Sequence, residues 1–229
     1  MSDFTVQDLK IRAREGGYVR GQEGLERILK AALTLLIEHG ASALTMRRIA
    51  AECGLKAGNI AYYFASKEEL LRELLDAIIN SFEGAFDTIY QTPGATPDER
   101  LARVVTFIFE DANTKASARI FPELWAMSNH DPFVRDRVEE MYARGRVVLN
   151  DLIAEINPAL PADERETLAL FMSASMEGVG FFAGYERPAS AKLPALERIA
   201  IKSFLHVVHT LQPGEISAGL KPGKRPRAT

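Results

Sequence analysis

The chain has 229 residues, of which 47% are hydrophobic and 26% are charged, and its formal net charge is −3. This composition excludes a disordered chain and permits a sizeable core without disulfide or metal staples. It also places no overall positive field on the molecule, so nucleic-acid binding would require a local basic surface. No apolar run reaches the ~20 residues of a membrane span, no secretory signal is evident, and the single cysteine fits a reducing compartment. We therefore expect a cytoplasmic protein.

Helical periodicity runs through the first third of the chain. A first helix carries apolar residues over 25–36 and ends at Gly40. Thr45 is a good N-cap for a short second helix, which ends at Gly54. A third helix is expected over 56–63, and a Ser-x-x-Glu capping box then starts a long helix that reaches about residue 89.

The rest of the chain continues the helical pattern after a break at 92–94. Thr96 and the proline after it open a helix with an acidic residue at the capping-box position. A shorter apolar segment follows at 120–125, and a loop is expected at 184–194. No segment alternates with a period of two, so we predict an all-α fold. The remaining helices are expected over 131–156, 168–179 and 196–211.

The second and third predicted helices form a helix-turn-helix, because two short helices meet there around the glycine turn at Gly54. In such a unit the N-terminal end of the second helix lies nearest the base edges of DNA. Ile60 and Phe64, four residues apart, point into the core, and the small residues at 57–58 allow a close approach of the backbone to DNA.

Side chains suited to DNA contact surround this tip. Asn59 can pair with an adenine edge, and the Tyr62 ring can contact thymine methyl groups. Basic residues and a helix N-terminus can bind phosphates. The residues predicted to contact DNA are Thr45, Arg47, Arg48, Lys56, Ala57, Gly58, Asn59, Tyr62, Tyr63 and Lys67.

The stretch ALTMRRIAAECGLKAGNIAYYFASKEELL closely resembles the N-terminal DNA-binding domain of the TetR family of bacterial transcriptional regulators. The resemblance covers about residues 22–82 and rests on the order of its parts: a capping Thr, an Arg, Ile-Ala, a turn glycine, an aromatic pair ending in Phe, and Lys-Glu-x-Leu. Two positions depart from the family pattern. Lys56 stands where a capping Ser is frequent, and Ala61 stands where a Tyr is frequent, so an operator sequence does not transfer from relatives.

The resemblance implies a homodimer in which a three-helix DNA-binding domain precedes a helical ligand-binding and dimerisation domain. The DNA-binding domain is then expected at 22–82 and the second domain at 83–211. Residues 1–21 are expected to form a flexible basic arm, whose Lys10, Arg12, Arg14 and Arg20 either reach DNA or remain solvated. Residues 212–229 are expected to form a disordered basic tail.

Large apolar side chains in the second half suit either a small-molecule pocket or ordinary core packing. The residues predicted to bind a ligand are Phe107, Phe121, Trp125, Met172, Met176 and Tyr185, with Glu123, Asn129 and Glu177 as possible orienting groups. The last two helices are the family's dimer interface. The residues predicted to form it are Ser175, Val179, Ile199, Ser203, Phe204 and Val207.

Together these features predict a ligand-responsive homodimeric repressor. It would bind a palindromic double-stranded DNA operator and be released by a small, partly apolar effector. A DNA-bound adaptor whose second domain binds another protein, or an activator on the same scaffold, fits the sequence as well. An enzyme is not expected, because we find no phosphate loop, nucleophile elbow or metal-ligand set, and no cofactor is implied. His206 and His209 lie three apart on one helix, where a surface role is the simpler reading.

Overall fold

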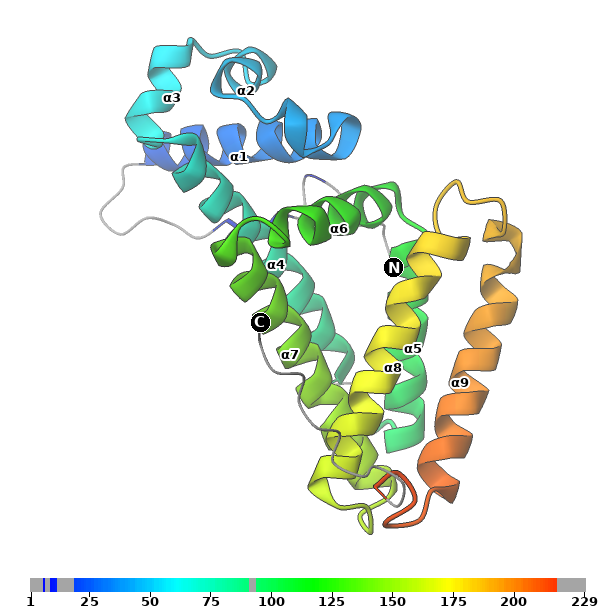
Figure 1. Cartoon of the computed structure of the whole chain (residues 1–229). Coiled ribbons are helices and arrows are strands. Elements are labelled where there is room, and N and C mark those ends of the chain that lie inside the picture. Colours follow the sequence, from blue (N-terminus) through cyan, green and yellow to red (C-terminus); the bar gives the residue numbers. More distant parts are fainter. Residues whose placement is uncertain (1–5, 7–8, 12–18, 91–93, 218–229) are drawn as a thin grey trace, which may run out of the picture.

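A computed structural model describes residues 6, 9–11, 19–90 and 94–217 of the chain, and within these ranges it contains helices and no strand (Figure 1). The predicted all-α fold is therefore confirmed. None of the described helices is long and apolar enough to cross a membrane. The helices are α1 (Val19–His39), α2 (Met46–Glu52), α3 (Ala57–Tyr63), α4 (Lys67–Tyr90), α5 (Pro97–Ala112), α6 (Lys115–Ser128), α7 (Pro132–Ile156), α8 (Ala162–Ala183) and α9 (Leu193–Thr210), with 3₁₀ turns at Ala41–Ala43 and Ser190–Lys192.

The predicted helix starts carry the expected side-chain caps. The Thr45 hydroxyl accepts a hydrogen bond from the backbone N–H of Arg48 at 3.2 Å. At the start of α5, Thr96 and Glu99 form a reciprocal capping box. The Ser66 hydroxyl accepts from the Glu69 N–H at 3.1 Å, but the Glu69 carboxylate accepts from the Ala65 N–H instead of closing the box on Ser66. Local capping thus fixes where these helices begin.

Several helices begin earlier than the sequence pattern indicated, including α8, which begins at Ala162 rather than near residue 168. The segment expected at 120–125 is part of α6, which begins after Thr114, whose hydroxyl accepts from the Ser117 N–H at 3.2 Å. The C-terminal part of the loop expected at 184–194 is a 3₁₀ turn that leads into α9 at Leu193. Neither start has a glycine-rich break before it, so the apolar pattern alone placed both boundaries too late.

Two hydrophobic cores organise the molecule. The first joins α1–α4 to α6 and the beginning of α7, with Ile60, Phe64 and Ile120 fully buried in it. The second joins α5, α8 and α9 to the remainder of α7. Figure 1 shows α4 and α7 running from the α1–α3 end toward the other end of the molecule. The helix-turn-helix therefore shares a continuous core with α6, a helix of the second half.

The described ends of the chain are packed, which differs from the free arm and tail expected at 1–21 and 212–229. Leu9 is buried in the first core, and the Lys10 N–H donates to the Ser81 hydroxyl on α4 at 2.8 Å. At the other end, the buried Glu164 carboxylate accepts hydrogen bonds from the N–H groups of Gly214 and Ser217. The Ser217 hydroxyl also donates to it, which lowers the pKa of Glu164. Arg12, Arg14 and residues 218–229 lie outside the described residues.

Candidate DNA-binding surface and ligand pocket

The short helix α3 presents its tip to solvent. Ile60 is fully buried and, with Phe64 just after the helix, anchors it to the core. Gly58 and Asn59 are exposed, and the Tyr62 side chain is 84% exposed. An exposed tyrosine of that size on a well-anchored helix is available to a partner rather than to the core. The side chain of Ala57 lies outside the described residues.

The predicted phosphate-binding residues around this helix are also exposed. Thr45, Arg47 and Arg48 lie at the start of α2, and Lys67 lies in the first turn of α4. Lys56 occupies the N-cap position of α3 without a side-chain capping bond. A lysine ammonium group has no acceptor and cannot cap a helix N-terminus, so the expected weaker cap is present and the side chain is exposed.

Tyr63 is placed differently from the other predicted DNA-contacting residues. Its ring is partly buried and packs against the first core. The hydroxyl oxygen would lie 2.1 Å from a Cβ atom built at Gly24 of α1, so a larger residue there would displace the end of the Tyr63 side chain. Tyr63 therefore packs on the core side of α3. The centroid of its ring lies 5.2 Å from the centroid of the exposed Tyr62 ring.

A cavity of about 110 Å³ lies among α4, α5, α6, α7 and α8. Of the residues predicted to bind a ligand, Phe107, Phe121, Trp125 and Met176 line it. The other two do not: Met172 is fully buried in the second core, and Tyr185 follows α8, where its N–H donates to the Ala112 carbonyl. Four of the six predicted residues thus come together on one cavity.

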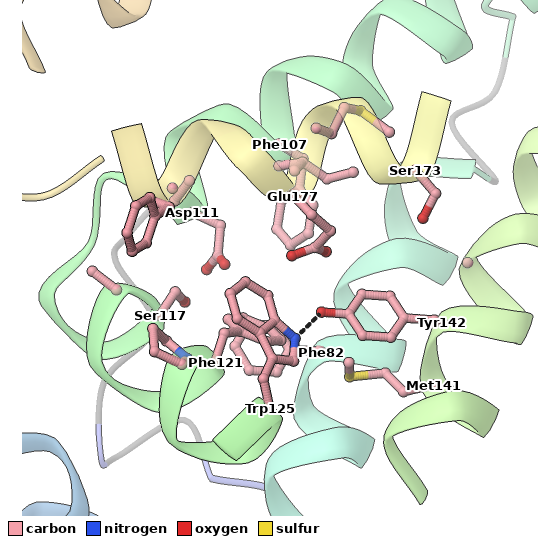
Figure 2. A pocket seen from close by; sticks show the side chains of 18 of the residues that line it. Phe82, Phe107, Asp111, Ser117, Phe121, Trp125, Met141, Tyr142, Ser173 and Glu177 are labelled. Carbon is pink, nitrogen blue, oxygen red and sulfur yellow. Dashed lines mark hydrogen bonds between the residues drawn. The ribbon is translucent and has the colours of Figure 1, made fainter. Parts of the chain in front are cut away.

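The polar groups of this cavity come from four helices (Figure 2), and Arg187 from the loop after α8 also lines it. Asp111 lies on α5, Ser117 on α6, Tyr142 on α7 and Glu177 on α8. Figure 2 shows the carboxylates of Asp111 and Glu177 directed toward the indole of Trp125. The indole N–H donates to the Tyr142 hydroxyl at 2.9 Å, and Tyr142 in turn is hydrogen-bonded to Glu177.

The carboxyl group of Glu177 changes its protonation state near neutral pH. Burial, and to a lesser degree the charge of Asp111, raise the pKa of Glu177 to about 7, while the Tyr142 hydrogen bond opposes that rise. Burial also raises the pKa of Tyr142, so its hydroxyl keeps its proton. Two acidic groups sharing one poorly solvated site destabilise each other's charged form, and a positive charge between them would relieve this.

Sequence reasoning named Glu177 as an orienting group but missed Asp111, Ser117 and Tyr142. No short motif joins them, because they meet only when α5, α6, α7 and α8 pack. The other two proposed orienting groups lie elsewhere. Glu123 accepts a hydrogen bond from the Ala41 N–H at 3.1 Å, and Asn129 is the C-cap residue of α6.

Helix α6 connects the cavity to the helix-turn-helix. It contributes Trp125 and Ser117 to the cavity wall. The same helix contacts the end of α1 and the turn before α2: Lys115 pairs with Glu38 at 2.7 Å, and Glu123 binds the turn at Ala41. The same helix thus contacts the cavity and the connection between α1 and α2.

The predicted dimer-interface residues fall into three groups. Ser175, Ile199 and Ser203 are exposed, and Val179 and Val207 are partly buried. Phe204 is only 6% exposed and belongs to the chain's own second core, so it packs inside the protomer beneath the exposed surface of α9. The exposed surface of α8 and α9 also carries large apolar side chains, including Phe182 at 71% and Ile199 at 61% exposure.

A helix-turn-helix with an exposed second helix, joined to a helical bundle that contains a pocket, defines a DNA-binding transcriptional regulator. Two family models match the chain: "bacterial regulatory proteins, tetR family" over residues 28–74, and "BetI-type transcriptional repressor, C-terminal" over residues 97–218. The chain therefore belongs to the TetR family of transcriptional regulators, with a second half of the BetI type.

Individual relatives agree with this assignment. An HTH-type transcriptional regulator of Xanthobacter autotrophicus is 27% identical over 76% of this chain and 84% of its own length. The regulator BetI of Agrobacterium fabrum is 27% identical over 69% of this chain and 77% of its own length. A transcriptional regulator from Saccharomonospora viridis, solved in complex with choline, shares the fold with a TM-score of 0.63 and 21% identity, covering 80% or more of both chains (82% and 97%).

Proposed function

We propose that this protein is a ligand-responsive homodimeric repressor that acts in the cytoplasm. In this proposal residues 22–82 bind a palindromic operator and residues 83–211 form the dimer and the effector pocket. A small, partly apolar cation releases the protein from DNA. The observation that carries the proposal is the cavity with two carboxylates and an indole, built on helices that contact the helix-turn-helix.

The effector is proposed to be an organic cation because of the groups that enclose the cavity. Aromatic faces attract a cation through their quadrupole, and Trp125 is the strongest such ring. Glu177 and Asp111 add negative charge on the same side of that ring. A cation is favoured beside these two carboxylates, although Arg187 already contributes one positive charge to the same cavity wall. The choline complex of the Saccharomonospora viridis protein supports this choice of ligand class.

The dimer is proposed to form through the exposed faces of α8 and α9. Ile199 and Phe182 are large apolar side chains that a monomer would leave in water. Ser175 and Ser203 are small, exposed residues on the same two helices, and small residues allow helices to approach closely. A two-fold axis through this face would place two α3 helices on one DNA duplex, about 34–36 Å apart for adjacent half-sites.

Release from DNA is proposed to follow a shift of α6. A cation between Trp125 and Glu177 pulls on the inner face of α6, and Glu123 on the same helix holds the turn at Ala41. If the bound form favours a different spacing of the two α3 helices, the effector lowers operator affinity by its differential affinity for the two states. Typical coupling of ~1–3 kcal/mol corresponds to a change of roughly 5- to 150-fold.

The test begins with sequencing the genomic DNA fragments that the purified protein retains at low salt. Affinity for the enriched duplex is then measured by fluorescence anisotropy with and without choline as the probe cation. We expect a two-fold symmetric site, tight binding and weaker binding with choline. Trp125→Ala should remove the choline response while Trp125→Phe keeps part of it, and both should bind DNA normally. A protein that retains no duplex at low ionic strength, or that ignores choline and other organic cations, would refute the proposal. A reporter gene would show whether the bound protein represses or activates.

A further inference from the structure

A buried glycine lies inside α1, where alanine would favour the helix more. Gly24 is part of this helix, and glycine weakens a helix interior because it loses more conformational freedom on folding than any other residue. The structure shows what occupies the space beside it. A Cβ atom built at Gly24 would lie 2.1 Å from the hydroxyl oxygen of Tyr63 and 2.6 Å from the ring carbon that carries this oxygen. The end of the Tyr63 side chain therefore lies where α1 would otherwise carry a side chain.

A second glycine of α1 shows that this contact is particular to one position. Gly21 lies three residues before Gly24 on the same helix. A Cβ atom built at Gly21 would meet no atom of the described residues within 4 Å. Alanine at 21 would therefore only favour the helix, whereas alanine at 24 would also displace the end of the Tyr63 side chain.

The orientation of α3 depends on contacts with the rest of the domain. The helix has seven residues, and a helix of that length is not stable in isolation. Its N-cap residue, Lys56, makes no side-chain capping bond. Ile60 is fully buried and holds α3 on the core. Tyr63, three residues later on a neighbouring face of the helix, adds the contact with α1 at Gly24.

The ring of Tyr63 also contacts the exposed ring of Tyr62. The two planes stand at 89°, so the rings meet edge to face, an arrangement favoured by the positive edge of one ring and the negative face of the other. Tyr62 lies largely in solvent at 84% exposure. A shift of the Tyr63 ring would therefore move the Tyr62 ring with it.

We propose that Tyr63, lying over Gly24 of α1, is a positioning residue for operator recognition: it sets the direction in which α3 presents Tyr62 to the base edges. This inference rests on the proposed function, in which α3 reads the operator. Gly24 is buried and Tyr63 is partly buried, so both act through Tyr62. Tyr63 thereby has an indirect role in place of the direct DNA contact expected from the sequence.

A displaced Tyr62 ring should affect base recognition more than phosphate binding. The residues proposed to bind phosphates, Arg47, Arg48 and Lys67, lie on α2 and α4. Phosphate contacts supply the affinity for any duplex, whereas contacts with base edges select the sequence. A substitution at Gly24 should therefore lower the ratio of operator affinity to affinity for an unrelated duplex. A variant that was only less well folded would lose both affinities together.

The experiment measures this ratio by fluorescence anisotropy, at a temperature well below the Tm of every variant. The two duplexes are the operator enriched from genomic DNA and a scrambled sequence of the same length. We expect Gly24→Ala to weaken operator binding about 5- to 20-fold, in the lower part of the range for a lost base contact, and to change binding of the scrambled duplex by about twofold or less. Gly21→Ala is the matched control. It should raise the Tm by about 2–4 °C and change neither affinity.

A double-mutant cycle tests whether Gly24 acts through Tyr63. Tyr63→Leu leaves α1 unaltered, removes the end of the ring, and should itself lower the ratio of operator to scrambled affinity. In the Tyr63→Leu background, Gly24→Ala should weaken operator binding by no more than about twofold, because no ring remains to be displaced. An equal loss in both backgrounds would overturn the inference, as would an unchanged ratio in Gly24→Ala or in Tyr63→Leu. In those cases the wild type still binds its operator and the proposed function stands, whereas a wild type that selects no operator would overturn both proposals.

Discussion

The balance of charge in the cavity predicts that effector binding depends on pH through Glu177. The pKa of this carboxyl is raised to about 7 by burial first and by Asp111 second. Only its ionised form attracts a cation strongly. Choline is the right probe because its quaternary ammonium group keeps its charge at every pH, so any pH dependence belongs to the protein.

The size of the effect follows from that pKa. With a pKa of about 7, Glu177 is ionised in about nine-tenths of molecules at pH 8 and in about one-tenth at pH 6. If the cation requires the ionised form, its affinity falls about tenfold between pH 8 and pH 6, which is about 1.4 kcal/mol. Binding should also release a proton near pH 7, because the bound cation lowers the pKa of the carboxyl. Calorimetry in two buffers of different ionisation enthalpy measures that release.

Matched variants isolate the group that titrates. Glu177→Gln should weaken choline binding at pH 8 and remove most of the pH dependence. Asp111→Asn should move the midpoint of the profile to lower pH, because it removes a negative charge that raises the pKa of Glu177. Arg187, which also lines the cavity and lies over the Phe181 ring, remains in every variant as a constant positive charge.

Ionisation of Glu177 has the opposite effect on the free protein: it favours cation binding but lowers the free energy of unfolding in the absence of ligand. A carboxyl whose pKa is raised by folding is harder to ionise in the folded than in the unfolded state. The stability of the fold is therefore independent of this group below the ordinary pKa of 4.5, falls as pH rises from 4.5 to about 7, and is constant again above that. Without ligand, Glu177→Gln should raise the Tm at pH 8 and leave it unchanged near pH 4. Choline affinity that is equal at pH 6 and pH 8, or pH dependence that persists in Glu177→Gln, would refute this reasoning.

Three further outcomes concern DNA binding and its control. Lys67→Ala should weaken binding to all duplexes and reduce by about one the slope of log affinity against log salt concentration. Lys192→Ala, a surface control far along the chain, should change neither the affinity nor the slope. An unchanged slope in Lys67→Ala would show that Lys67 does not contact a phosphate. Asn59→Ala should cost about 1–3 kcal/mol at one operator position if it pairs with adenine, and a uniform loss over all base substitutions would make it a positioning contact. Glu123→Ala should leave choline binding intact but reduce the effect of choline on operator affinity. Glu123→Gln keeps an acceptor for the Ala41 N–H and should retain the effect. An unchanged response in both variants would show that this contact does not couple the cavity to DNA binding.

The helices and their starts were predictable from the sequence because the signals are local. Thr45, Thr96 and Asp131 cap their helices as expected, and Gly54, with φ 65°, turns the chain between α2 and α3. The start of α6 was missed because no glycine or proline breaks the chain at 113–114. There the only signal is the Thr114 cap.

The pocket was predictable only in part. Aromatic and methionine side chains on helical faces suggested a pocket or a core, and Met172 shows that the same pattern also describes a core residue. The choice between the two depends on how five helices pack, which no local pattern records. Asp111, Tyr142 and Glu177 are isolated polar residues in their own helices, and only their convergence in space gives them a common role.

That convergence is itself the reason to regard the cavity as functional. Ser117 is buried, and Asp111, Tyr142 and Glu177 are partly exposed. A core selected only for stability would place apolar residues at these positions, because a polar group removed from water costs free energy unless it is paired. Instead, the Ser117 hydroxyl has no hydrogen-bond partner among the described residues, and the pKa of Glu177 is raised to about 7. Both side chains line the cavity that α6 borders, and Glu123 of α6 accepts a hydrogen bond from the Ala41 N–H. Destabilising groups of this kind persist where a ligand relieves them. Under the proposed function, α6 would pass the free energy recovered on binding to the connection between α1 and α2, which its Lys115 and Glu123 contact.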